Sequence, residues 1–147
     1  MPPSVRERLL QEIVSRLIPL AQAEGAQIKR SPTVAIGRDA SPALLLFPEA
    51  ESIVQRANDR LDRHLVVRLV AMARATDGES AEAICDRLQV AAHAALFADA
   101  NLGGWCLGLQ ELDCEWEVED ADATAAAVSA RYQFLYRTRV HDLTAPG

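Results

Sequence analysis

A thiol and an imidazole are the residues of this sequence that come nearest to a catalytic pair. Cys106 follows the turn residues Gly103-Gly104, and His93 lies in the alanine-rich segment before them. A Cys–His pair acts as a nucleophile only when the base is held against the thiol and lowers its pKa. Nothing near Cys106 in the sequence orients or activates it, and its neighbours Trp105 and Leu107 are typical of core packing. We expect no catalytic residue, and a small cysteine-dependent hydrolase is kept as an alternative.

Alternating acids are the second feature with potential chemistry, because carboxylates bind divalent cations. Asp113, Glu115, Glu117 and Glu119 recur at every second residue. On a strand such side chains stand about 7 Å apart, so they cannot converge on one ion without ligands from other elements. We interpret them as a solvated or partner-facing strand face and expect no metal site.

Motifs for cofactors are also missing from the sequence. The three histidines have no metal-binding spacing, and the glycines of residues 103–108 lack the Lys-Ser/Thr ending of a phosphate-binding loop. The three cysteines have no C-x-x-C spacing, which indicates reduced thiols in a cytoplasmic protein. We expect no cofactor.

Composition limits the remaining functions. The chain has 147 residues, of which 50% are hydrophobic, so we expect a single domain over residues 1–147 with its own core. The net charge is -6 and there is no run of Lys and Arg, which argues against sequence-specific binding of nucleic acid. Neither a signal peptide nor an apolar stretch long enough to span a membrane is predicted.

Two helices are predicted from capping signals and apolar spacing. Ser4 to Glu7 reads as a capping box, and apolar residues then recur at helical spacing. Pro19 is expected to kink this helix or end its regular part, and Gly25 is the latest position at which it stops. Thr76 to Glu79 reads as a second capping box, beginning a helix that ends near residues 99–101.

Between the helices, residues 27–42 are rich in Pro and Gly. They are predicted as loop with a short extended piece at Val34 to Ile36. Ala43 to Phe47 is an apolar run closed by Pro48, which favours a buried strand.

Residues 51–74 favour a long hairpin. Its second half is rich in β-branched residues, and Ala57 to Arg60 supplies turn residues. A helix over Glu49 to Arg63 is the open alternative, because its apolar residues also have tolerable helical spacing.

Two long strands are predicted to close the chain. Residues 112–118 alternate apolar with acidic side chains, and residues 126–140 alternate apolar side chains with Arg and other polar residues. The apolar side chains of the two strands lie on the same face of the sheet only if the numbers of paired residues sum to an even number. Trp116 opposite Val128 and Asp113 opposite Arg131 is an example of such a register. Acid–arginine pairs then line the outer face. The fold class predicted is α+β, a mostly antiparallel sheet with two helices on one face, in the order α-β-β-α-β-β.

This layout resembles the tail terminator proteins of long-tailed bacteriophages, the minor tail protein U type of family. The features that carry the resemblance are the opening helix from Ser4, Pro42-Ala43-Leu44, the strand His64 to Arg74, Asp99-x-Asn101-Leu102-Gly103-Gly104, the acidic strand Cys114 to Glu119, and the strand Val128 to Val140 with Tyr136-Arg137-Thr138.

The resemblance implies a structural protein that is no enzyme. Such a protein forms a homo-oligomeric, hexameric ring on the completed tail tube, stops tube polymerisation and offers the surface that joins the head. Its partners are further copies of itself, the tail tube protein and a head-completion or connector protein, and DNA passes through the ring. It acts in the host cytoplasm during assembly and then at the head-proximal end of the tail. A cytoplasmic accessory binding domain is a further hypothesis.

Charged residues of the last two strands are the candidates for contacts between subunits, although some can pair within one chain. The acidic candidates are Glu115, Glu117 and Glu119, and the basic candidates are Arg131, Arg137 and Arg139.

Overall fold

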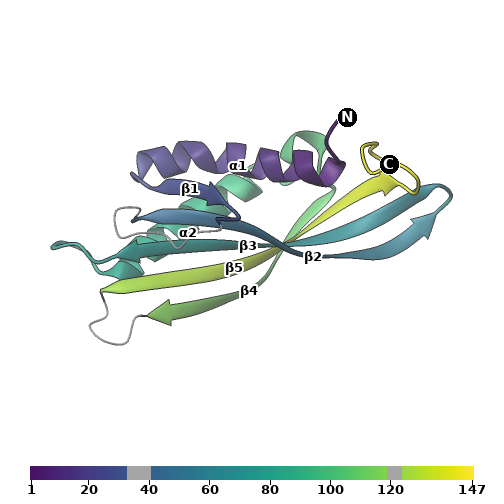
Figure 1. Ribbon diagram of the computed structural model, residues 1–147. Coiled ribbons are helices and arrows are strands. Elements are labelled where there is room, and N and C mark those ends of the chain that lie inside the picture. Colours follow the sequence, from purple (N-terminus) through teal and green to yellow (C-terminus); the bar gives the residue numbers. More distant parts are fainter. Residues whose placement is uncertain (33–40, 119–123) are drawn as a thin grey trace.

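One five-stranded sheet with two helices on one face makes up the fold (Figure 1). The computed structural model describes residues 1–32, 41–118 and 124–147. The order of the described strands is β1-β2-β3-β5-β4, and among them only the β1–β2 pair is parallel. The predicted α+β class and element order are therefore confirmed, with one additional short strand. The elements are α1 (Val5–Ala23), β1 (Gln27–Arg30), β2 (Ala43–Ala57), β3 (Arg60–Arg74), α2 (Ala81–Phe97), a 3-10 turn (Leu102–Gly104), β4 (Gly108–Val118) and β5 (Ala125–Arg139).

The cap of α1 follows the prediction in part. The backbone N–H of Glu7 donates to the Ser4 hydroxyl oxygen at 3.0 Å, as a capping box requires. The Glu7 carboxylate, however, accepts from Arg30 at 2.7 Å, so it joins α1 to β1. The helix continues through Pro19 to Ala23.

The start of α2 was predicted wrongly. Ser80 is the N-cap, and its hydroxyl accepts from the backbone N–H of Ala83 at 3.2 Å. The segment Thr76 to Glu79 is a turn, in which the Thr76 N–H donates to the Glu79 carbonyl at 2.9 Å. Both segments offer a capping hydroxyl, and the helix starts at the one that places Ala81 directly on the core.

The segment predicted as loop contains the strand β1. It pairs in parallel with Ala43 to Leu46 of β2, and the Gln27 N–H donates to the Pro42 carbonyl at 3.0 Å. Its four residues carry no alternation of polar and apolar side chains, so only pairing with β2 identifies it. The extended piece predicted at Val34 to Ile36 lies outside the described residues.

The predicted hairpin of β2 and β3 is confirmed, and the helix alternative over Glu49 to Arg63 is wrong. Contrary to the expected stop at Pro48, β2 continues past it with register shifts after Pro48 and after Ile53. Pro48 has no N–H to donate, and it is tolerated because that part of β2 lies on a sheet edge. Asn58 has a positive φ of 58°, as tight turns between strands require.

The predicted register of β4 and β5 is also confirmed. Trp116 lies opposite Val128 and Asp113 lies opposite Arg131. A register shift between Glu111 and Asp113 places Glu111 opposite Tyr132. Paired residue numbers therefore sum to an even number, as predicted, only on the C-terminal side of Leu112.

Side chains of α1, α2, β2, β3 and β5 form the core. Leu9 and Leu17 of α1 and Leu88 of α2 are fully buried, and they pack with alternate residues of β3 and β5. The apolar face of β4 was expected in this core and does not belong to it: Trp116 is 45% exposed and Val118 is 39% exposed. The reason is that α2 packs on β3 and β5, which leaves the edge strand β4 beyond its cover.

Within residues 1–32, 41–118 and 124–147, neither helix combines the length and the hydropathy that crossing a membrane requires.

Adjacent residues of α1 test the position of the core. Leu17 is fully buried and Ile18 is 39% exposed. We expect Leu17→Ala to lower the free energy of unfolding by about 2 to 5 kcal/mol, because it leaves a cavity. Ile18→Ala is the matched control and is expected to cost less than about 1 kcal/mol. Urea unfolding of both variants measures the difference, and equal losses would contradict the burial of this helix face.

Candidate functional site

Two edges of the sheet expose strand backbone. β4 forms one edge, where β5 is its neighbour. On the opposite edge β1 pairs only with Ala43 to Leu46, so from Phe47 onward β2 has no outer neighbour among the described residues. Backbone N–H and C=O groups on such edges are ready to pair with another chain. The two edges differ in sequence and lie on opposite sides of the molecule.

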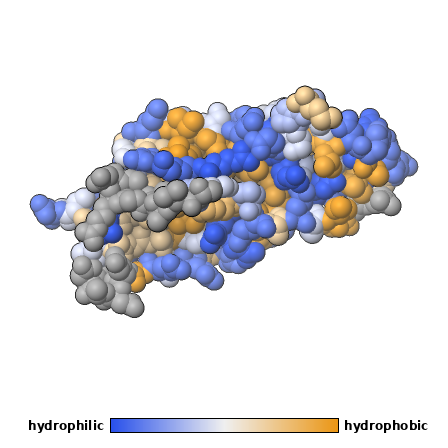
Figure 2. Space-filling view, viewed as in Figure 1, coloured by the Kyte–Doolittle hydropathy of each residue, from blue (hydrophilic) through white to orange (hydrophobic). Residues whose placement is uncertain are grey.

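The far end of the β2–β3 hairpin extends past the helices (Figure 1). We call residues 52–62 the arm. Ile53 is 56% exposed and Val54 is 57% exposed, although both are aliphatic. Figure 2 shows apolar residues on the surface at this end of the molecule.

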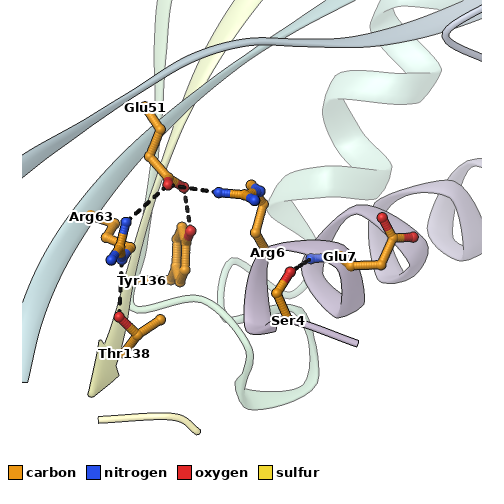
Figure 3. Close-up of polar contacts among 7 residues, drawn as sticks. All are labelled: Ser4, Arg6, Glu7, Glu51, Arg63, Tyr136 and Thr138. Atoms are coloured by element: carbon orange, nitrogen blue, oxygen red, sulfur yellow. Dashed lines mark hydrogen bonds and ion pairs between the residues drawn. The ribbon is translucent and has the colours of Figure 1, made fainter. Parts of the chain in front are cut away.

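A polar cluster holds the base of the arm (Figure 3). The Glu51 carboxylate accepts from Arg6 of α1 at 2.9 Å, from Arg63 of β3 at 3.2 Å and from the Tyr136 hydroxyl of β5. Arg63 also donates to the Thr138 hydroxyl at 2.9 Å. Burial raises the pKa of the Tyr136 hydroxyl well above its ordinary value, and the hydrogen bond to the Glu51 carboxylate raises it further. The hydroxyl therefore keeps its proton and donates it to this hydrogen bond. Four elements are thus joined where the helix layer ends.

The acidic candidates for subunit contacts lie on the outer face, which carries no helix. Glu115 is opposite Ser129 and Glu117 is opposite Ala127, and both side chains are exposed. They line a hollow of about 100 Å³ together with Arg68. Glu119 lies outside the described residues.

The basic candidates all have carboxylate partners within the chain. Arg131 donates to Asp113 at 2.7 Å, as the register predicted, and it also donates to Glu49 at 2.9 Å. Arg137 donates to Asp62 at 2.6 Å. The pairing was foreseen for Asp113 alone.

Arg139 donates to Asp59 at 2.5 Å, and this hydrogen bond lowers the pKa of the Asp59 carboxyl. In the registers of β3, β4 and β5, Glu115 and Glu117 lie at one end of the sheet, and Arg137 and Arg139 lie at the other. Their role between subunits stays a prediction.

Sequence reasoning missed a groove between α2 and β4. It has a volume of about 410 Å³ and is lined by Gln89, Val90, His93, Ala94 and Glu111. Val90 is 61% exposed, and the Gln89 side-chain amide donates to the Cys114 sulfur of β4 at 3.3 Å. The acid-rich strand around Trp116 could have indicated this groove, because charged residues are typical of strands at the edge of a sheet.

The structure does not bring Cys106 and His93 together as a pair. The buried Cys106 thiol donates to the Gly108 carbonyl at 2.8 Å. His93 Nδ1 lies 2.9 Å from the Tyr132 hydroxyl and 3.2 Å from the Glu111 carboxylate. Burial raises the pKa of the Cys106 thiol, which disfavours the thiolate that nucleophilic catalysis needs.

Metal ligation finds no support in the described part of the chain. No group of three or more His, Cys, Asp or Glu side chains there could hold a metal ion. The carboxylates of β4 that the sequence singled out point to solvent or to Arg131.

Among the comparisons with known proteins, only solved structures are similar to this chain. No family model and no curated protein matches the sequence. Among solved structures, a chain of the "Virion of native gene transfer agent (GTA) particle" is similar with a TM-score of 0.47 and 13% identity, over 84% of this chain and 90% of that chain. A TM-score and an identity this low carry no argument about function.

The Asp113–Arg131 pair gives a test of register. We expect the double reversal Asp113→Lys, Arg131→Glu to lower the melting temperature by less than the sum of the two single reversals, because the pair is restored in the opposite sense. Glu49 limits the recovery, since it then faces a like charge. The coupling should shrink at high salt because the pair is exposed. Strictly additive effects at low salt would contradict the pairing.

The three thiols should differ in reactivity. Burial raises the pKa of Cys85 to about 11 and also raises that of Cys106, whereas Cys114 is exposed. We expect iodoacetamide near neutral pH to alkylate Cys114 in the folded protein, and Cys85 and Cys106 only after unfolding. Mass spectrometry of the peptides measures this order. Rapid labelling of folded Cys106 would revive the hydrolase hypothesis.

Proposed function

We propose that this protein is a structural subunit of a phage tail, which caps the completed tail tube as a homo-oligomeric ring of six copies. It ends polymerisation of the tube and provides the surface to which the head-completion protein binds. The proposal rests on the resemblance of the sequence layout to tail terminators and on the surfaces of the fold.

The observation that carries the proposal is that one chain has two unlike open surfaces on opposite edges of its sheet. A closed ring of identical subunits needs two different surfaces on each copy, which meet head to tail and close by rotation. The β4 edge with its neighbouring groove and the β2 edge with its arm meet that requirement.

Charge supports passage of DNA through such a ring. The net charge of -6 gives a surface that makes few of the cation–phosphate contacts on which non-specific DNA affinity depends. The expected partners are the tail tube protein, the head-completion protein and further copies of the chain.

Tails assembled with and without this protein test the function. We expect tubes made without it to vary in length and to join heads poorly, and added wild-type protein to restore both properties. Electron microscopy measures tube length and the fraction of tubes that carry heads. Tubes of uniform length that join heads equally well in its absence would show that the proposal is wrong.

A further inference from the structure

We propose that β4 binds an extended basic segment of a partner protein, which adds a strand to the free edge of the sheet. In this segment Lys or Arg alternates with apolar residues. The inference goes beyond the proposed function, because it names the chemistry of a partner and does not depend on tube capping. The groove beside α2 and the edge of β2 stay open to further copies of the chain.

The backbone of β4 is paired on one side. Its neighbour over Gly108 to Val118 is β5, and no strand lies beyond it among residues 1–32, 41–118 and 124–147 (Figure 1). Every second residue of such a strand turns its N–H and C=O groups away from the sheet, where another extended chain can pair with them. Strand addition at an exposed edge is a common mode of peptide binding by a sheet.

Charge on the outer face decides which chain fits this edge. Glu115 and Glu117 are exposed, and the side chain of neither makes an ion pair or a hydrogen bond with any described residue. Both line a hollow of about 100 Å³ together with Ser129 of β5. Arg68 of β3 lines it from across β5, but its guanidinium carbon lies 4.9 Å from the centre of the Phe47 ring and it makes no ion pair with either carboxylate. Basic side chains on an added strand supply the missing partners, because residues opposite each other on neighbouring strands are in contact.

The same carboxylates disfavour other occupants of the edge. Two copies that met β4 to β4 in one continuous sheet would place acidic side chains opposite acidic side chains, which destabilises a strand pair. An acidic peptide would meet the same repulsion, and so would the phosphates of nucleic acid. A basic segment is therefore the occupant whose charge is complementary to this face.

The helix side of β4 determines the residues between the basic ones. Trp116 and Val118 are exposed on this side, opposite the buried side chains of Val128 and Ala126. Successive residues of a strand point to opposite faces, so a segment with basic residues on the outer face presents its intervening side chains beside Trp116. Apolar residues at those positions remove exposed apolar surface from water. The segment therefore alternates Lys or Arg with residues such as Val or Ile.

Binding of a synthetic peptide to the whole protein tests the chemistry of the partner. The probe is a short peptide in which Lys and Val alternate, and the reference is the same peptide with Glu in place of each Lys. We expect calorimetry at low salt to show binding of the Lys–Val peptide, and binding of the reference to be at least about tenfold weaker. Absence of binding by the Lys–Val peptide, or equal affinities for both peptides, overturns the proposal.

Matched variants separate the edge of β4 from negative charge in general. The double variant Glu115→Gln, Glu117→Gln should raise the Kd of the Lys–Val peptide at least about tenfold. The control Glu82→Gln, Asp86→Gln removes the same charge from two exposed residues of α2 and should raise the Kd by less than about threefold. Urea unfolding checks that both variants are folded. Equal losses of affinity would show that the peptide follows net charge alone, and would overturn the site on β4.

Hydrogen exchange of the backbone tests strand addition itself. Amide protons that point away from the sheet become hydrogen-bonded when a strand adds to β4, so the peptide should slow exchange within Gly108–Val118. Exchange within α1 is the internal control and should not change. Binding without slower exchange in β4 overturns strand addition. None of these measurements involves tail tubes, so failure of this proposal and failure of the tube-capping function are observed separately.

Discussion

A mismatch of lengths between the helices and the strands governs the rest of this structure. β3 and β5 each have 15 residues, which span about 50 Å at about 3.3 Å per residue. α1 has 19 residues and is only about 29 Å long. Two helices of this size cannot cover five strands along their full length. One end of the hairpin and one edge strand must therefore lie outside the helix layer (Figure 1).

Where the helix layer ends, polar contacts replace apolar packing. Glu51 brings Arg6, Arg63 and Tyr136 together at the base of the arm, so the first turn of α1 is joined to three strands. A carboxylate that is only 15% exposed is tolerated there because cations and a hydroxyl satisfy its oxygens. The cluster therefore holds the base of the arm against α1, β3 and β5.

The same arrangement separates charge along the sheet. Arg131, Arg137 and Arg139 each form an ion pair with a carboxylate of their own chain, so these pairs join neighbouring parts of the outer face. Exposed pairs of this kind contribute little to stability.

The sequence by itself determined the elements whose signals are local. The Ser4 cap, the apolar period of two in β5 and the parity that pairs Asp113 with Arg131 follow from the geometry of helices and strands alone. Tertiary structure decided everything that depends on position in the sheet. β1 has no period of its own and exists because β2 lies beside it, and Ser80 displaced the earlier capping box because Ala81 packs on the core. The alternation of apolar and acidic residues in β4 does not tell whether this strand is central in the sheet or at its edge. Only the placement of α2 over β3 and β5 left Trp116 exposed, because a helix covers the strands it packs on and no others.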